Sequence, residues 1–196
     1  MSPTLLALTI PESVYEQYAT VLTQEERGNA VVVLGSFKQL PKINKTIAIF
    51  QENDLRVLAP RLSYIISETD GFPVLKSDQD TIKRLLADYP DQAETWYHAV
   101  LERIFMAHIQ QVRHIYIVDE GGYAGTTVAM EIGFARAVPG VNIKALEPID
   151  PKLDWNDGFD YWSGAIWAGC VMDIETMSPQ DFIASIRADH KDFKNI

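Results

Sequence analysis

The stretch Ile115–Ala137, IYIVDEGGYAGTTVAMEIGFARA, decides the fold. Its β-branched run Ile115–Val118 predicts a buried strand, Gly121–Gly122 predict a tight turn, and Gly125–Thr126–Thr127 predict a helix start. Such a unit directs backbone N–H groups and the positive end of the helix dipole to one point, where an anion or electron-rich ligand can bind. Glu131 lies in an otherwise almost apolar helix, where a carboxylate is costly unless it is paired or functional. We therefore expect the active site here.

Length and composition fit one domain spanning residues 1–196, with 47% hydrophobic and 22% charged residues. The net charge of −10 argues against nucleic acid or an anionic membrane surface as the main partner. The single Cys170 excludes an intrachain disulfide, and the four histidines lack metal-ligand spacing, so we expect no metal and no cofactor. No signal peptide or membrane span is expected, which leaves the cytoplasm as the default location.

Sequence periodicity predicts alternating strands and helices along most of the chain. Residues 1–28 are expected to be a helical extension, with the helix itself at 11–27. Strands are expected at 30–34, 55–58, 115–118 and 142–146, with 63–67 ambiguous, and helices at 41–50, 78–88, 91–111, 126–138 and 178–188. Residues 151–196 are expected to hold an aromatic loop and the last helix, and 147–177 show no period, which indicates an ordered loop region.

This alternation predicts an α/β fold: a doubly wound, mostly parallel five-stranded sheet with helices on both faces, of the flavodoxin or Rossmann kind. Ligands of such sheets bind at the carboxyl ends of strands, where the strand order reverses. The turns that follow Leu34 and Val118 both lie at carboxyl ends. We therefore expect these two turns to form a single site.

The two turns offer different chemistry. The second turn combines Gly122, Tyr123 and Gly125 with Thr126 and Thr127, a plausible nest for a phosphate or a sugar hydroxyl. The glycine spacing does not fit the dinucleotide fingerprint, and no acidic residue follows at the expected place; the turn is not a P-loop either, because no Lys follows Gly125. The first turn supplies a hydroxyl, an aromatic ring and a cation directly after a strand; these are Ser36, Phe37 and Lys38. Phe37 belongs either to the core or to a stacking contact with a planar base.

Glu131 is the predicted catalytic residue. Its helix is apolar nearly all round, which predicts that it is buried, and Thr127 one turn earlier shares its face. The simpler alternative is a surface glutamate or one paired with an arginine. Desolvation raises the pKa of such a carboxyl while the helix N-terminus lowers it. We expect an ionised, poorly solvated carboxylate, suited to a nucleophile or to stabilising an oxocarbenium ion.

Together, GSFKQL at 35–40 and the pattern from Gly125 through Glu131-Ile132-Gly133-Phe134-Ala135 resemble the nucleoside 2-deoxyribosyltransferase superfamily, which includes nucleotide N-glycosidases. The resemblance covers roughly residues 30–150. It implies that Glu131 attacks or shields the anomeric carbon, while Ser36, Phe37, Gly125 and Thr127 line the sugar, base or phosphate pocket. It also implies a small nucleoside or nucleotide as substrate, with hydrolysis and transfer both open.

One residue departs from this pattern. Family members usually carry an Asp on the helix before the nucleophile strand, and the corresponding place falls near Phe105. Glu102 and His98 are the nearest polar candidates for a second acid or base. Two other functions stay open: a phosphoribohydrolase of the cytokinin-activating type, whose Gly-Gly-x-Gly-Thr-x-x-Glu motif is matched imperfectly, and a non-catalytic nucleotide-binding module.

Aromatic residues gather near the C-terminus, in a cluster comprising Trp155, Phe159, Tyr161, Trp162 and Trp167. Such a cluster suggests a pocket lid, an oligomer contact or a segment packed over the sheet. Members of the superfamily commonly complete their pockets with residues from a neighbouring subunit. This resemblance and the aromatic cluster together predict a homo-oligomer, at least a dimer. A neighbour could then supply the missing Asp.

Overall fold

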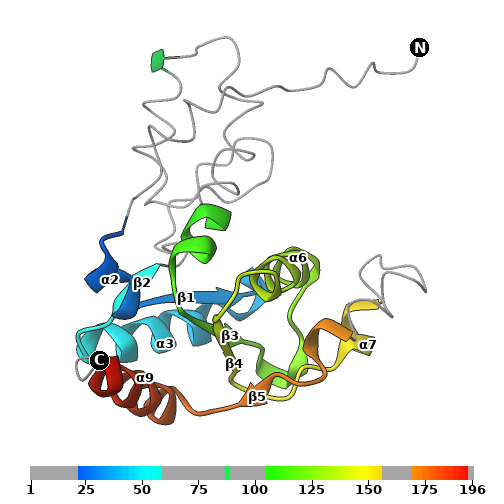
Figure 1. Cartoon of the computed structure of the whole chain (residues 1–196). Coiled ribbons are helices and arrows are strands. Elements are labelled where there is room, and N and C mark those ends of the chain that lie inside the picture. The colour runs from blue at the N-terminus through cyan, green and yellow to red at the C-terminus, as the bar shows by residue number, and fades with distance from the viewer. Residues whose placement is uncertain (1–21, 59–86, 89–104, 156–168, 194–196) are drawn as a thin grey trace. The chain divides into compact units, whose positions relative to one another are not determined.

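A computed structural model describes residues 22–58, 87–88, 105–155 and 169–193 (Figure 1). The chain divides into two compact units, one comprising 1–21 and 60–108 and the other 22–59 and 109–196. The second unit contains the sheet and both predicted turns, and the account below concerns it. None of the helices in the described part of the chain has the length and apolar character needed to cross a membrane.

The second unit is built on five parallel strands in the order β2-β1-β3-β4-β5. Their bounds are β1 Ala30–Gly35, β2 Arg56–Leu58, β3 His114–Val118, β4 Asn142–Ala145 and β5 Glu175–Thr176. The central strands β1 and β3 are mostly apolar and almost wholly buried, as is typical of parallel strands covered on both faces. This arrangement confirms the predicted doubly wound α/β fold.

Helices lie on both faces of this sheet (Figure 1). The helical elements whose bounds the structure describes are α2 Gln24–Gly28, η1 Phe37–Gln39, α3 Leu40–Glu52, η3 Glu120–Gly122, α6 Thr126–Arg136, α7 Pro151–Trp155 and α9 Pro179–Phe193. In Figure 1, α3 and α9 lie on one face of the sheet and α6 on the other. The core between α3, α9 and the sheet is aromatic: the Tyr116 ring centroid lies 5.2 Å from that of Phe50 and 5.0 Å from that of Phe182.

The strand order reverses between β1 and β3. The chain leaves β1 through α3 to reach β2 on one side, and β3 then pairs with the opposite side of β1, with Gly35 beside Val118. The carboxyl ends of β1 and β3 therefore meet at the switch point where ligands bind in such sheets. Both predicted turns start there.

Within the described ranges most predicted elements are confirmed to within a few residues, but one strand was not predicted. It is β5, a two-residue strand inside the segment 147–177 that was expected to be a loop, and that segment also holds α7. A two-residue strand is too short to show any sequence period. The alternative strand at 63–67 lies outside the described residues, as do most of the helices predicted at 78–88 and 91–111; residues 105–111 are helical.

The prediction of one continuous helix over 11–27 is wrong at its C-terminal end. Thr23 has extended backbone angles (φ −65°, ψ 164°) and caps a separate helix, α2, through a capping box with Glu26. The threonine hydroxyl satisfies a backbone N–H that a helix start leaves open, so a new helix begins at Gln24. Residues 11–21 lie outside the described part of the chain.

Candidate active site

The two predicted turns lie side by side at the switch point. We call residues 36–39 the β1 turn and residues 119–125 the β3 turn. A Cβ atom placed on Gly125 would lie 3.5 Å from Ser36 Oγ and 3.5 Å from the Tyr123 hydroxyl. Gly125 has φ +95°, a conformation that favours glycine, and it is the N-cap of α6. The serine of one turn and the helix start of the other thus meet.

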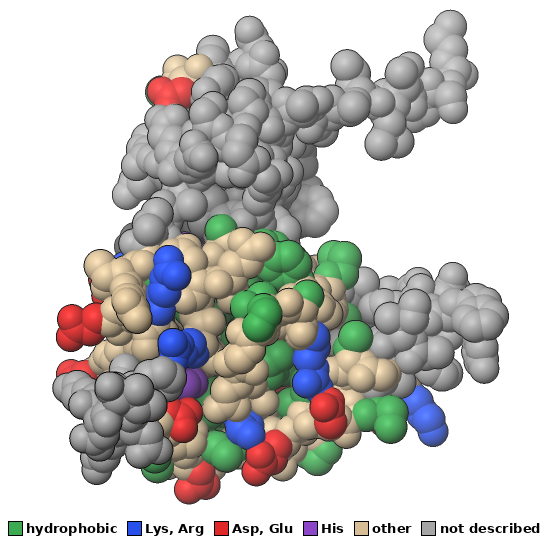
Figure 2. Space-filling view, viewed as in Figure 1, with side chains coloured by type: hydrophobic (Ala, Val, Ile, Leu, Met, Phe, Trp, Pro, Cys, Tyr) green, Lys and Arg blue, Asp and Glu red, His purple; other side chains and the backbone are tan. Residues whose placement is uncertain are grey.

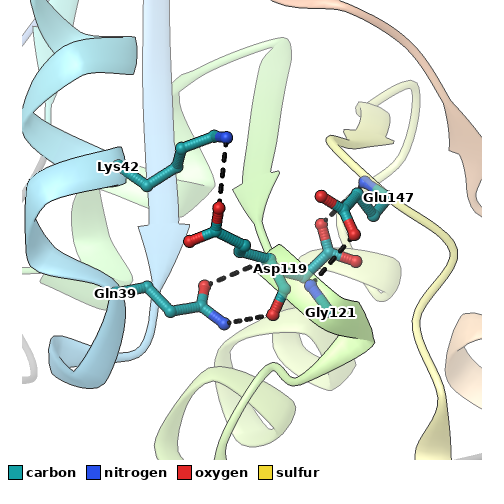
Figure 3. A network of polar contacts seen from close by, with 6 residues as sticks. Gln39, Lys42, Asp119, Gly121 and Glu147 are labelled. Atoms are coloured by element: carbon teal, nitrogen blue, oxygen red, sulfur yellow. Dashed lines mark hydrogen bonds and ion pairs between the residues drawn. The ribbon is translucent and has the colours of Figure 1, made fainter.

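Gln39, which no sequence pattern assigns a role, joins the two turns. Its Nε2 donates to the backbone oxygens of Glu120 (2.9 Å) and Tyr123 (3.0 Å), and its Oε1 accepts from Glu120 N (3.1 Å). Figure 3 shows this amide reaching from the start of α3 to the β3 turn, with Lys42 above it. Lys42 Nζ lies 3.3 Å from Glu120 Oε1. Only 8% of Gln39 is exposed. The amide therefore braces the site from within.

Lys38 and Tyr123 form a second bridge between the turns. The Lys38 ammonium donates to the Tyr123 hydroxyl at 3.0 Å and lies 4.5 Å from the centroid of its ring. Lys38 is exposed and Tyr123 half-buried, so the contact lies at the surface of the site. It places a cation and a phenol hydroxyl near Ser36 and Gly125, an arrangement suited to an anionic ligand.

The N-terminus of α6 lies at this point. Gly125 carries no side chain that could cap the helix, and its first-turn N–H groups begin beside Ser36. Such groups and the helix dipole favour an anion. Thr127 in this first turn is exposed. Phe37 begins η1 and Thr126 begins α6, but their side chains lie outside what the structure describes.

Glu131 is buried on α6, with 6% of its surface exposed. It shares the inner side of the helix with Val128, Ile132 and Ala135, which are buried as well. The expectation of a helix buried nearly all round is wrong, because Thr127 is exposed and Met130 is 58% exposed. A helix on the outer layer of an α/β sheet needs to cover only one side, and methionine tolerates exposure. Glu131 is thus buried because it lies on the side of α6 that faces the protein interior.

Asp119 is a second buried carboxylate, which sequence reasoning left without a role. It directly follows β3 and is fully buried; its Oδ1 accepts from Glu147 N at 3.0 Å, and its Oδ2 has no hydrogen-bond partner among the described residues. Burial raises the pKa of Asp119 to about 6, and the charge of Glu147 adds to this against the lowering effect of the Glu147 N–H. An acidic residue at the end of a buried strand was the available signal.

Gly122 carries the β3 turn past the loop after β4. It has φ +81°, and a Cβ there would lie 2.8 Å from the carbonyl oxygen of Pro148. Asp150 N donates to Gly122 O at 2.9 Å across the same contact. The glycine predicted to bind substrate therefore has a clear packing role.

Several predicted residues lie outside the described part of the chain. These are Glu102 and His98, the two candidates for a second acid or base, and the aromatic residues from Phe159 to Trp167. Trp155 ends α7, without a described side chain. Within the described ranges, no group of three or more His, Cys, Asp or Glu residues is arranged to hold a metal ion.

Comparisons of the chain with protein-family models, with curated proteins and with solved structures found no match. The resemblance carried by the two turns therefore stays a prediction, and function must be argued from the geometry of the site.

Proposed function

We propose that this protein cleaves or transfers at the N-glycosidic bond of a nucleoside or nucleotide, with Glu131 as the catalytic carboxylate. One observation carries the proposal: a buried glutamate lies on the helix whose N-cap, Gly125, meets Ser36 at the switch point of the sheet. A buried carboxylate is expensive, and such groups concentrate at functional sites.

The chemistry needs one carboxylate and an anchor for the substrate. Glu131 bonds to, or stabilises, the anomeric carbon as the C–N bond breaks and its electron pair leaves with the base. Water then yields the free sugar, or a second base yields a new nucleoside. Ser36, Lys38, Tyr123 and the first turn of α6 would hold a phosphate or sugar hydroxyl.

The proposal is tested by incubating the purified protein with a panel of nucleosides and nucleoside monophosphates, with and without a second base. Free or exchanged base is measured by chromatography. Glu131→Gln preserves volume and removes the charge, so turnover should fall by at least about a hundredfold. Glu52→Gln, an exposed glutamate at the end of α3, is the matched control and should keep full activity.

Two results would overturn the proposal: no base released from any member of the panel, or near-normal turnover by the Glu131→Gln protein. Nucleotide binding without turnover would instead identify a non-catalytic binding module. Release of an intact ribose 5-phosphate from a base-modified nucleotide, and from no ordinary one, would favour the phosphoribohydrolase alternative.

The proposed enzyme acts in the cytoplasm on a small molecule and forms a homo-oligomer. Three large apolar side chains are exposed in the described part of the chain, Met130, Leu153 and Met172, and Figure 2 shows apolar side chains at the surface between charged ones. A contiguous patch of such side chains favours a contact between subunits. Light scattering at micromolar concentration tests this, and a mass of 22.1 kDa would mean a monomer.

A further inference from the structure

The β3 turn is tied to the loop after β4 by two carboxylates. We call residues 146–150 the β4 loop. Asp119 Oδ1 accepts from Glu147 N at 3.0 Å, and Glu147 Oε2 accepts from Gly121 N at 2.9 Å, so each acidic side chain binds the backbone of the other segment. Figure 3 shows the two carboxylates next to each other between β3 and the β4 loop. The arrangement is a reciprocal clasp of two like-charged groups.

The clasp is unbalanced in charge. Glu147 faces Asp119 from the β4 loop. The Tyr116 hydroxyl on β3 donates to Met177 O at 2.6 Å, and burial, together with the charges of Asp119 and Asp181, raises the pKa of this phenol and keeps it neutral. Glu120, next in the chain, is paired with Lys42 from α3. Asp119 is fully buried, and its Oδ2 has no hydrogen-bond partner among the described residues. A buried carboxylate with an unsatisfied oxygen beside a second carboxylate favours taking up a proton.

We propose that Asp119 and Glu147 form a pH-responsive latch, in which a proton on Asp119 keeps the β4 loop closed on the β3 turn and loss of that proton loosens it. Opening hydrates the Asp119 carboxyl and separates it from Glu147. The carboxyl then regains its ordinary acidity, so deprotonation must favour the open form by linkage. No new bond and no cofactor are needed.

The pKa of Asp119, raised from 3.8 to about 6 in the closed form, sets the size of the effect. Linkage between these two values makes the equilibrium constant for opening about tenfold larger at pH 8 than at pH 5. The β3 turn carries Tyr123 and Gly125 to the start of α6, so an open latch loosens one wall of the candidate site. The latch stands independently of the reaction proposed above.

Amide hydrogen exchange followed by NMR tests the latch, with rates corrected for the intrinsic effect of pH. The protection factor of the Glu147 amide, which donates to Asp119, should fall about tenfold between pH 5 and pH 8. The amide of Ile117 in the centre of β3 reports global unfolding, which also exposes Asp119, so its protection factor should fall by a similar factor. The Glu147 amide should be less protected than the Ile117 amide at both pH values, because the latch opens without global unfolding. A Glu147 protection factor that does not change with pH would overturn the proposal.

Variants separate the latch from other titrating groups. Asp119→Asn should abolish the pH dependence at Glu147, and Glu147→Gln should weaken it and move it to lower pH because the repelling charge is gone. Glu120→Gln removes the neighbouring exposed carboxylate and should behave as wild type. If Asp119→Asn does not fold, Glu147→Gln alone decides. A wild-type response in Asp119→Asn or Glu147→Gln contradicts the latch.

Discussion

The β3 turn is held in opposite ways on its two flanks. Toward β1, the neutral amide of Gln39 makes three hydrogen bonds to its backbone, and Lys42 pairs with Glu120. Toward β4, two carboxylates, Asp119 and Glu147, bind backbone N–H groups with no cation bound to either in the described contacts. An amide does not titrate and a carboxylate does. One flank therefore keeps its strength at every physiological pH, whereas the other depends on a proton.

The flank toward β4 is less stable than it could be, because it contains the buried carboxyl of Asp119. An asparagine at 119 would offer the same acceptor to Glu147 N without the cost of a buried charge. The carboxyl of Asp119 is thus a residue choice that does not favour the stability of the fold. Such choices are expected at functional positions. The flank toward β4 is the one to change if the response to pH is to be altered without disturbing the rest of the turn.

The largest expected effect tests how tightly the β4 flank is packed. Gly122→Ala strains a residue at φ +81° and drives its Cβ to 2.8 Å from Pro148 O, so we expect a loss of about 3 to 4 kcal/mol in unfolding free energy. Gly121→Ala is the matched control: its φ is +70°, nothing lies within 4 Å, and the loss should be about 1 kcal/mol. Urea unfolding measures both. Equal losses of unfolding free energy for the two variants would mean that the β4 loop moves away from the added methyl group at little cost.

The opposite flank is broken by Gln39→Ala. Removing this buried amide leaves the Glu120 N–H and two carbonyl groups without their partner, so we expect a loss of about 2 to 3 kcal/mol. Because no titrating group is lost, urea unfolding should give the same loss at pH 5.5 and pH 7.5. Gln51→Ala, an exposed change on α3, should cost less than about 0.5 kcal/mol. A loss that varied with pH would contradict the contrast between the flanks.

Asp119→Asn should reveal the flank that titrates. A folded-state pKa raised from 3.8 to about 6 means that the folded protein binds more protons than the unfolded chain between these values. Its stabilising effect is complete below pH 4 and is lost as pH rises through 6. Relative to wild type, Asp119→Asn should therefore gain about 2 kcal/mol on going from pH 4 to pH 7.5.

Urea titrations at several pH values, with Glu120→Gln as the control, measure this gain. The control should follow wild type, since Glu120 is exposed and pairs with Lys42 at the surface. A constant difference between Asp119→Asn and wild type across this range would show that Asp119 ionises with an ordinary pKa in the folded protein.

The sequence predicted the frame of the site better than its contacts. Buried apolar runs at β1 and β3 and the glycines after them are local signals, and they placed both turns at the switch point. The braces were missed because their partners are remote: Gln39 and Glu120 are 81 residues apart, and Asp119 and Glu147 are 28 apart. Only the register between parallel strands brings them together. Asp119 alone had a local signal, an acidic residue directly after a buried strand.

The smallest expected effect concerns the bridge between Lys38 and Tyr123. Tyr123→Phe deletes the hydroxyl that accepts from Lys38 but keeps the ring under the ammonium, 4.5 Å from its centroid. The contact is at the surface, so unfolding free energy should change by less than about 0.5 kcal/mol at any pH. The hydroxyl also lies 3.5 Å from where a Gly125 Cβ would stand, at the start of α6. If this hydroxyl binds a ligand there, calorimetric titration with the substrate should show weaker binding by Tyr123→Phe at unchanged stability. A large loss of unfolding free energy would instead mean that the hydroxyl holds the two turns together, as the Gln39 amide does.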